Sequence, residues 1–168
     1  MKFNKEPFLL KGKKTEDFFA SMFEPVFLPT KKEDIYEHWD VSIGIKVDVK
    51  GMKKIRRHDS EPNENIHYIE IKTNTGHNGW AYGEADFFAF ETESYFVIVE
   101  KKRLQEWIAK NVQKEYNDDG SLKFCVQPTL YHLYQKKECK DILTLVKTLD
   151  LCAISTTILQ KPKTDVNN

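Results

Sequence analysis

The chain has few cysteines, and their spacing is not typical of a site. Cys125, Cys139 and Cys152 are an odd number of thiols, lie far apart and include no Cys-x-x-Cys pair. A zinc site usually draws on closely spaced ligand pairs, and a disulfide framework usually has an even number of cysteines. The pattern therefore favours free thiols in a reducing compartment.

Long apolar runs are also missing. No segment approaches the roughly 20 apolar residues of a membrane span. The start of the chain, residues 1–6, is not followed by an apolar stretch of signal-peptide length. We therefore expect a cytoplasmic protein without a membrane partner.

An excess of charge of either sign is absent as well. The 26 basic and 26 acidic residues cancel, which argues against nucleic-acid binding through bulk charge. A local basic segment nevertheless exists, and it is either a solvated turn or a set of phosphate contacts. Six basic residues fall within twelve positions: Lys46, Lys50, Lys53, Lys54, Arg56 and Arg57.

The length and composition are typical of one globular domain. The 168 residues are 40% apolar and 31% charged, which is enough to bury a substantial core. No internal repeat divides the chain, so a single domain over residues 1–168 is predicted. The polar tail 161–168 is predicted to be disordered.

Apolar periodicity predicts a mixture of helices and strands. Thr15 is predicted to cap the first helix. Residues 141–150 fit a strand or a short helix equally well. The predicted helices are 15–24, 31–37 and 101–115, and the predicted strands are 45–50, 66–72, 86–90, 95–99, 123–126 and 130–134.

The strand predicted over 45–50 carries an unusual acidic residue. Side chains alternate along a strand, so Val47 and Val49 share one face and Asp48 lies on the other. Aspartate is disfavoured in strands. Asp48 is either a solvent-facing residue of an edge strand or a functional group.

The strand predicted over 66–72 carries a second carboxylate and a lysine on one face, Glu70 and Lys72. If the two strands pair, Asp48 can converge with them. Two carboxylates and an ammonium in one cleft can hold a divalent cation and activate a water. The alternative is a half-exposed strand whose salt pair contributes little.

Asp48 followed by Glu70-Ile71-Lys72 resembles the signature of the PD-(D/E)XK nuclease superfamily, in particular its small phage-type members. The likeness covers a core of about residues 34–112. Val47 stands where the signature has proline. The resemblance implies a restriction-endonuclease-like α/β (α+β) fold, with a central mixed sheet of about five strands flanked by helices.

The resemblance also implies an activity, which is hydrolysis of DNA phosphodiester bonds with Mg²⁺ or Mn²⁺. In that pattern Asp48, Glu70 and the Ile71 carbonyl hold the metal, and Lys72 assists the attacking water. The DNA would be duplex or branched, and cutting both strands of a duplex would favour a homodimer. A phage-encoded enzyme of this kind would act in the cytoplasm of the host cell.

Further site residues are expected around this centre. Glu37, His38 and Asp40 are candidates for an additional ligand, and they are equally consistent with surface residues around a core Trp39. Trp80, on a glycine-rich loop, either stacks on bases or folds back onto the core. The candidate nucleic-acid-binding residues are Lys50, Lys53, Lys54, Arg56, Arg57 and Trp80.

Two other functions compete with a nuclease. One is a catalytically inactive nuclease-fold binding module, and the other is a mobile-element protein that binds a host protein. The presence of Asp48, Glu70 and Lys72 together favours the enzyme. A metal site would support the enzyme, whereas a stable complex with a host protein would support the second alternative.

Overall fold

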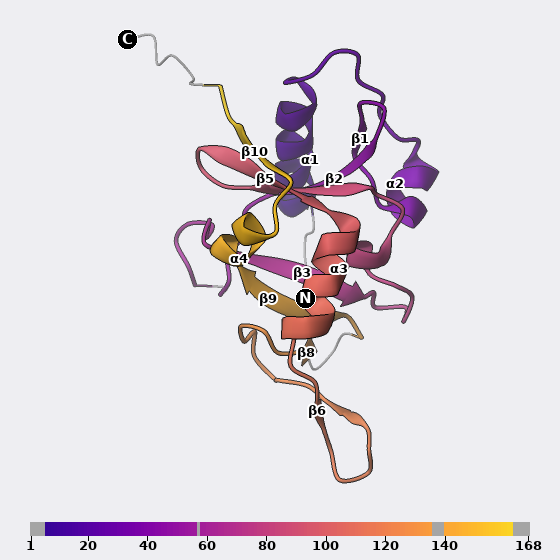
Figure 1. The fold of residues 1–168 in the computed structure, drawn as a ribbon, viewed down its shortest axis with the longest axis vertical. Helices are drawn as coiled ribbons and strands as arrows, with labels where there is room; N and C mark the ends of the chain where they lie inside the picture. Colours follow the sequence, from indigo (N-terminus) through magenta and orange to yellow (C-terminus); the bar gives the residue numbers. More distant parts are fainter. Residues whose placement is uncertain (1–5, 57, 136–139, 163–168) are drawn as a thin grey trace.

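The computed structural model describes residues 6–56, 58–135 and 140–162. Arg57, Cys139 and residues 163–168 of the predicted disordered tail lie outside this part of the chain. The predicted α+β class with a central five-stranded mixed sheet flanked by helices is confirmed (Figure 1). Among the described residues, no helix is long and apolar enough to cross a membrane.

The five-stranded sheet has the order β1-β2-β4-β5-β10. The β2–β4 pair is parallel, and the three other pairs are antiparallel. The hairpin predicted over 86–90 and 95–99 forms its centre. The strands are β1 (Val41–Ser42), β2 (Lys46–Lys50), β4 (Phe87–Glu91), β5 (Tyr95–Glu100) and β10 (Thr157–Gln160).

A second sheet contains β3 (Ile66–Lys72), β9 (Ile142–Lys147) and β8 (Tyr134–Gln135), all antiparallel. The expectation that the strands of Asp48 and Glu70 might pair is therefore corrected. Both edges of β2 are occupied, one by β1 and the other by β4, so β3 pairs with β9 instead. In Figure 1, β3 and β9 lie below the five-stranded sheet.

The first helix, α1 (Glu6–Ala20), begins well before the predicted start. Thr15 is not its cap, because it is buried inside the helix and its hydroxyl donates to Glu91 Oε2 at 3.1 Å. The helix predicted over 31–37 is confirmed as α2 (Lys31–Glu37), which Thr30 begins with a reciprocal capping box.

The third helix, α3 (Lys101–Asn111), ends before the predicted boundary. The ambiguous segment 141–150 contains both predicted states, because strand β9 leads directly into α4 (Thr148–Ala153). The predicted strands 123–126 and 130–134 are reduced to short pieces and isolated bridges. A small hairpin of β6 (Glu115–Tyr116) and β7 (Leu122–Lys123) precedes them.

Two apolar clusters lie on opposite faces of the five-stranded sheet. Alternation along β4 sends Ala89 to the α1 side, where Phe19 packs on Phe96 at 5.0 Å between ring centroids. Phe88 and Phe90 face the other way, toward the second sheet. The buried core on that side includes Val146 and Leu151. Residues beyond the predicted core of 34–112 thus complete the fold.

Candidate functional site

Asp48 lies between the two sheets. Val47 and Val49 of β2 pack on the α1 side, so Asp48 points to the opposite face. Its register partner on β4 is Phe88, and its exposed fraction is 2%. An aspartate buried this deeply is unusual, because desolvation penalises its charged form.

Lys50 is the cationic partner of Asp48. It lies two residues along the same strand and therefore on the same face, and its Nζ is 2.5 Å from Asp48 Oδ1. The ammonium also lies over the ring of Trp80, 4.5 Å from the centroid, in a cation–π contact. Trp80 packs in turn on Phe88 at 5.1 Å. The tryptophan thus fixes Lys50 beside Asp48.

Asp40 provides a second carboxylate. Its backbone N–H donates to the Val47 carbonyl at 2.8 Å, and its Oδ2 accepts the Val49 N–H at 2.6 Å. These bonds hold Asp40 against the strand that carries Asp48. Burial raises the pKa of Asp48 well above its usual range, Lys50 opposes this, and the Asp40 carboxyl adds to it. We call Asp40, Asp48 and Lys50 the Asp48 cluster.

The other two residues of the 37–40 segment have different roles. Glu37 is held by Lys46 Nζ at 2.7 Å and by the Trp39 indole at 3.2 Å. His38 caps α2 in a left-handed conformation with φ 56°. Burial and the nearby Lys50 lower its pKa, while Glu70 opposes them. Of the three candidates in this segment, Asp40 is therefore the one that adjoins Asp48.

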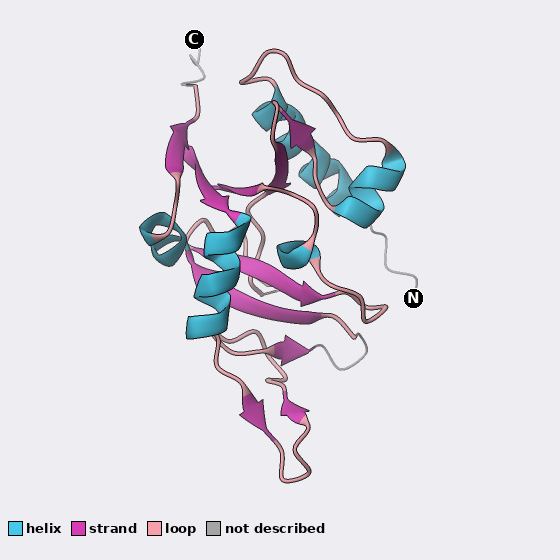
Figure 2. Ribbon diagram, turned by 45° about the vertical axis from the view of Figure 1, so that its right-hand side comes forward, coloured by secondary structure: helices cyan, strands magenta, loops and turns pink. Residues whose placement is uncertain are grey.

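Glu70 borders the same region from the second sheet. The 3₁₀ helix η1 (Trp80–Tyr82) lies above β3 in Figure 2, and the Trp80 N–H donates to Glu70 Oε2 at 3.4 Å. A Cβ on Gly79 would stand 2.5 Å from the Glu70 carbonyl oxygen. Only glycine allows this close approach, so Gly79 brings Trp80 over β3.

The remaining residues of the predicted motif are placed differently. The Ile71 carbonyl accepts the Gly79 N–H at 2.9 Å, so it helps to close the loop. Lys72 is exposed at the end of β3, and a register shift between Glu70 and Lys72 interrupts the regular alternation. Within the described residues, Lys72 makes no ion pair. The lysine that contacts Asp48 is therefore Lys50.

Sequence reasoning placed Lys50 among the nucleic-acid-binding residues and missed its contact with Asp48, although a signal for that contact was present. Asp48-Val49-Lys50 has the same carboxylate-x-lysine spacing as Glu70-Ile71-Lys72. Because residues i and i+2 of a strand share a face, the first of these spacings already predicts a contact within one strand.

The basic segment after β2 lies only partly beside the site. Although Lys53 is exposed as a residue, surrounding protein atoms and the charge of Lys50 lower the pKa of its ammonium. Lys54 and Arg56 are exposed. Trp80 is 9% exposed and its ring is covered by Lys50, so of the two predicted arrangements the structure has the one in which Trp80 folds back onto the core.

The expected magnesium site needs a test against this geometry. No three His, Cys, Asp or Glu side chains within the described ranges are close enough together to hold a metal ion. Mg²⁺, however, is commonly held by one or two carboxylates together with waters and substrate phosphates. Asp48 Oδ2 is fully buried and has no hydrogen-bond partner in the described structure. A buried oxygen of this kind calls for a cation or donor, so Asp48 with Asp40 fits such an ion.

A buried histidine beneath the site gives a prediction for stability. His67 is 4% exposed, and burial lowers its pKa from 6.5 to about 4. Between these values the unfolded chain binds a proton that the folded chain does not, so stability falls as the pH falls. We expect His67 to destabilise the fold by about 3 kcal/mol between pH 7 and pH 4.

Urea unfolding of wild type and His67→Leu at several pH values measures this contribution. The variant should lose stability less steeply than wild type over that interval. Parallel curves for the two proteins would show that His67 is protonated equally in the folded and unfolded chains.

The structure thus brings together a buried carboxylate, a second carboxylate and a fixed ammonium in the Asp48 cluster. Glu70 approaches it from a different sheet. Lys53 approaches it from the basic segment that follows β2. In comparisons with protein-family models, curated proteins and solved structures, we found no match to this chain.

Proposed function

We propose that this protein is a metal-dependent nuclease that hydrolyses phosphodiester bonds of DNA at the Asp48 cluster. The observation that carries the proposal is the environment of Asp48. This residue is buried, is paired with a lysine, and has one carboxylate oxygen without a hydrogen-bond partner among the described residues. A buried carboxylate with a strongly shifted pKa and a specific charge partner is a typical feature of functional sites. The resemblance to PD-(D/E)XK nucleases supports the reaction class.

Each residue of the cluster has a distinct role in this proposal. Asp48 and Asp40 would hold Mg²⁺ or Mn²⁺. The bound ion would neutralise phosphate charge and lower the pKa of a coordinated water. Lys50 stabilises negative charge that develops on the phosphate, because its ammonium is already oriented by Asp48 and Trp80. Glu70 adds negative charge at the border of the site.

The substrate would be bound locally, since the chain has no net charge. Lys53, Lys54 and Arg56 follow the end of β2, the strand that carries Asp48 and Lys50. Contacts of lysine and arginine with phosphates position a nucleic acid without reading its sequence. We expect two copies of the chain to cooperate when both strands of a duplex are cut.

A nuclease-fold binding module without activity is the second candidate. It is favoured by the lack of a three-residue ligand group among the described residues. Such a module would bind nucleic acid or a host protein. It differs from the nuclease in needing neither a metal nor Asp48 for its function.

Cleavage of linear, circular and branched DNA with Mg²⁺, with Mn²⁺ or with EDTA tests the proposal. We expect cutting that requires a metal, is lost in Asp48→Ala and persists in Lys110→Ala, a control on the exposed face of α3. The proposal fails if wild type cuts none of these substrates and calorimetry finds no metal binding that depends on Asp48. The preferred DNA form would define the substrate further.

A further inference from the structure

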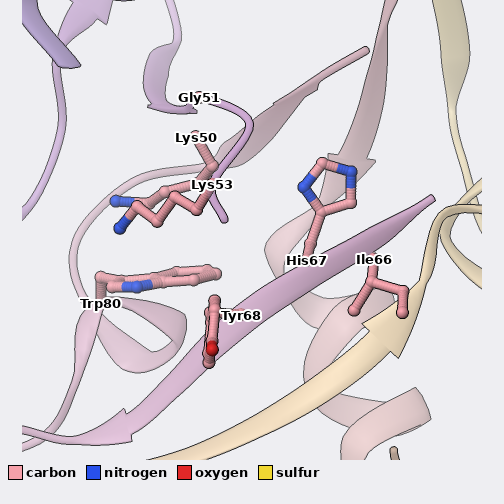
Figure 3. A pocket seen from close by; sticks show the side chains of 7 residues that line it. All are labelled: Lys50, Gly51, Lys53, Ile66, His67, Tyr68 and Trp80. Atoms are coloured by element: carbon pink, nitrogen blue, oxygen red, sulfur yellow. The ribbon is translucent and has the colours of Figure 1, made fainter. Parts of the chain in front are cut away.

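Two ammonium groups converge next to the Asp48 cluster. Figure 3 shows the Lys50 and Lys53 side chains running side by side, with their nitrogens at the same end and the Trp80 ring below them. Lys50 comes from the end of β2 and Lys53 from the segment that follows it. Lys54 and Arg56 do not line the small cavity beside these two lysines.

The positive charges of the two ammonium groups are not neutralised to the same extent. Lys50 has Asp48 as an ion-pair partner and the face of Trp80 as a second contact. In the portion of the chain that the structure describes, Lys53 has no carboxylate within ion-pair distance. Burial lowers the pKa of Lys53, and the charge of Lys50 lowers it further through mutual repulsion, while Glu70 and Asp48 oppose both effects. An anion between the two groups would offset that repulsion.

A small cavity lies beside this pair. Its volume is about 20 Å³, which is the space of one water or one oxygen atom. His67 lines it and is 96% buried, since its exposed fraction is 4%. Its Nε2 has no hydrogen-bond partner in the described structure. In Figure 3 the ring nitrogen of His67 that faces the two lysines is Nδ1, and Nε2 lies on the far side of the ring. The lining residues are Lys50, Gly51, Lys53, Ile66, His67, Tyr68 and Trp80.

We propose that Lys50 and Lys53 form a phosphate site, in which one phosphate oxygen enters the cavity and Lys53 holds the substrate beside the Asp48 cluster. This inference rests on the proposed nuclease function. It gives Lys53 a role in positioning the substrate that the other basic residues of its segment do not share. Because the cavity admits a single oxygen, the rest of the phosphate group must remain at its mouth.

The phosphate could belong to the continuous backbone or to a strand end. Both carry the same non-bridging oxygens, but a terminal phosphate bears a charge of about −1.5 to −2 at pH 7. Two adjacent ammonium groups stabilise the larger charge more strongly. A preference for a terminal phosphate would point to action from DNA ends, whereas equal binding would point to internal cutting.

Binding without metal tests the site independently of catalysis. Fluorescence anisotropy in EDTA would use short single strands that carry a 5′-phosphate, a 3′-phosphate or hydroxyls at both ends, with inorganic phosphate as competitor. Wild type is compared with Lys53→Ala, Lys53→Arg and Lys110→Ala, the last of which removes the same charge from α3. Thermal unfolding confirms that each variant is folded.

We expect Lys53→Ala to weaken binding by about tenfold and to reduce the salt dependence of the affinity by roughly one phosphate contact. Lys110→Ala should change neither quantity. Lys53→Arg should retain most of the affinity. A loss confined to one phosphorylated end identifies a terminal phosphate, and an equal loss on all strands identifies the backbone. Equal affinities of Lys53→Ala and Lys110→Ala would overturn the phosphate site, even if the protein cleaves DNA. Absence of cleavage with a Lys53-dependent affinity would overturn only the nuclease.

Discussion

Lys50→Ala is expected to reduce metal-dependent DNA cleavage by about 10²–10³-fold. The ammonium of Lys50 is 2.5 Å from Asp48 and lies over Trp80, and Lys50 is the lysine that pairs with Asp48 in the described structure. Its loss removes positive charge at the position where charge on the phosphate develops. Only 21% of the Lys50 side chain is exposed. The substitution therefore changes the Asp48 cluster itself and not the open surface.

Lys72→Ala is the matched comparison, because Lys72 belongs to the carboxylate-x-lysine spacing that the sequence first suggested. It is exposed at the end of β3, beyond the register shift. We expect its cleavage rate to stay close to that of wild type. Single-turnover rates at saturating protein would compare the chemical steps of both variants. A large loss of cleavage rate in Lys72→Ala, with little loss in Lys50→Ala, would show that the catalytic lysine is Lys72 of the second sheet.

Asp48→Asn is expected to abolish cleavage and at the same time to stabilise the metal-free protein. Burial raises the pKa of Asp48 well above its usual range. A folded-state pKa above the unfolded value contributes stability at low pH, and that stability is lost as the pH rises toward the folded-state pKa. At neutral pH the metal-free fold therefore either holds a costly carboxylate or takes up a proton. Asparagine keeps the shape of the side chain without this cost.

Thermal unfolding in EDTA at several pH values would measure the effect. The Tm of Asp48→Asn should exceed that of wild type at pH 8 by on the order of a few degrees, and the two values should approach one another near pH 4. Leu149→Ala, at an exposed position of α4, provides a control without a charge change. A lower Tm for Asp48→Asn at pH 8 would mean that the ion pair with Lys50 outweighs the cost of burial.

The local structure of this chain could be predicted from sequence better than its topology. Alternation identified β2 and β3, because each has one apolar face, and two short apolar segments separated by a polar turn identified the β4–β5 hairpin. Alternation says nothing about which strand lies next to which. The pairing of β3 with β9 joins segments about seventy residues apart. The residue pattern of either strand does not indicate which other strand it will pair with.

The site could be predicted in part for the same reason. Asp48 was identified because aspartate is disfavoured in strands and because Glu70-Ile71-Lys72 follows it in a pattern that resembles the nuclease signature. Lys50 was assigned to nucleic-acid binding, although its spacing places it on the same face of the strand as Asp48; the structure adds the contact with Trp80. Asp40 could not be separated from Glu37 and His38, because the left-handed residue that ends α2 changes the direction of each side chain.

The parallel pairing of β2 with β4 has a consequence for the order in which the molecule assembles. Parallel neighbours need a long crossover, and here residues 51–86 supply it, with β3 and Trp80 inside it. The hairpin of β1 and β2 can form from local contacts while Asp48 is still hydrated. Its carboxylate loses water only when the crossover closes and the distant strands meet. We therefore expect the slow, long-range steps of folding and the desolvation of the Asp48 carboxylate to occur together in this chain.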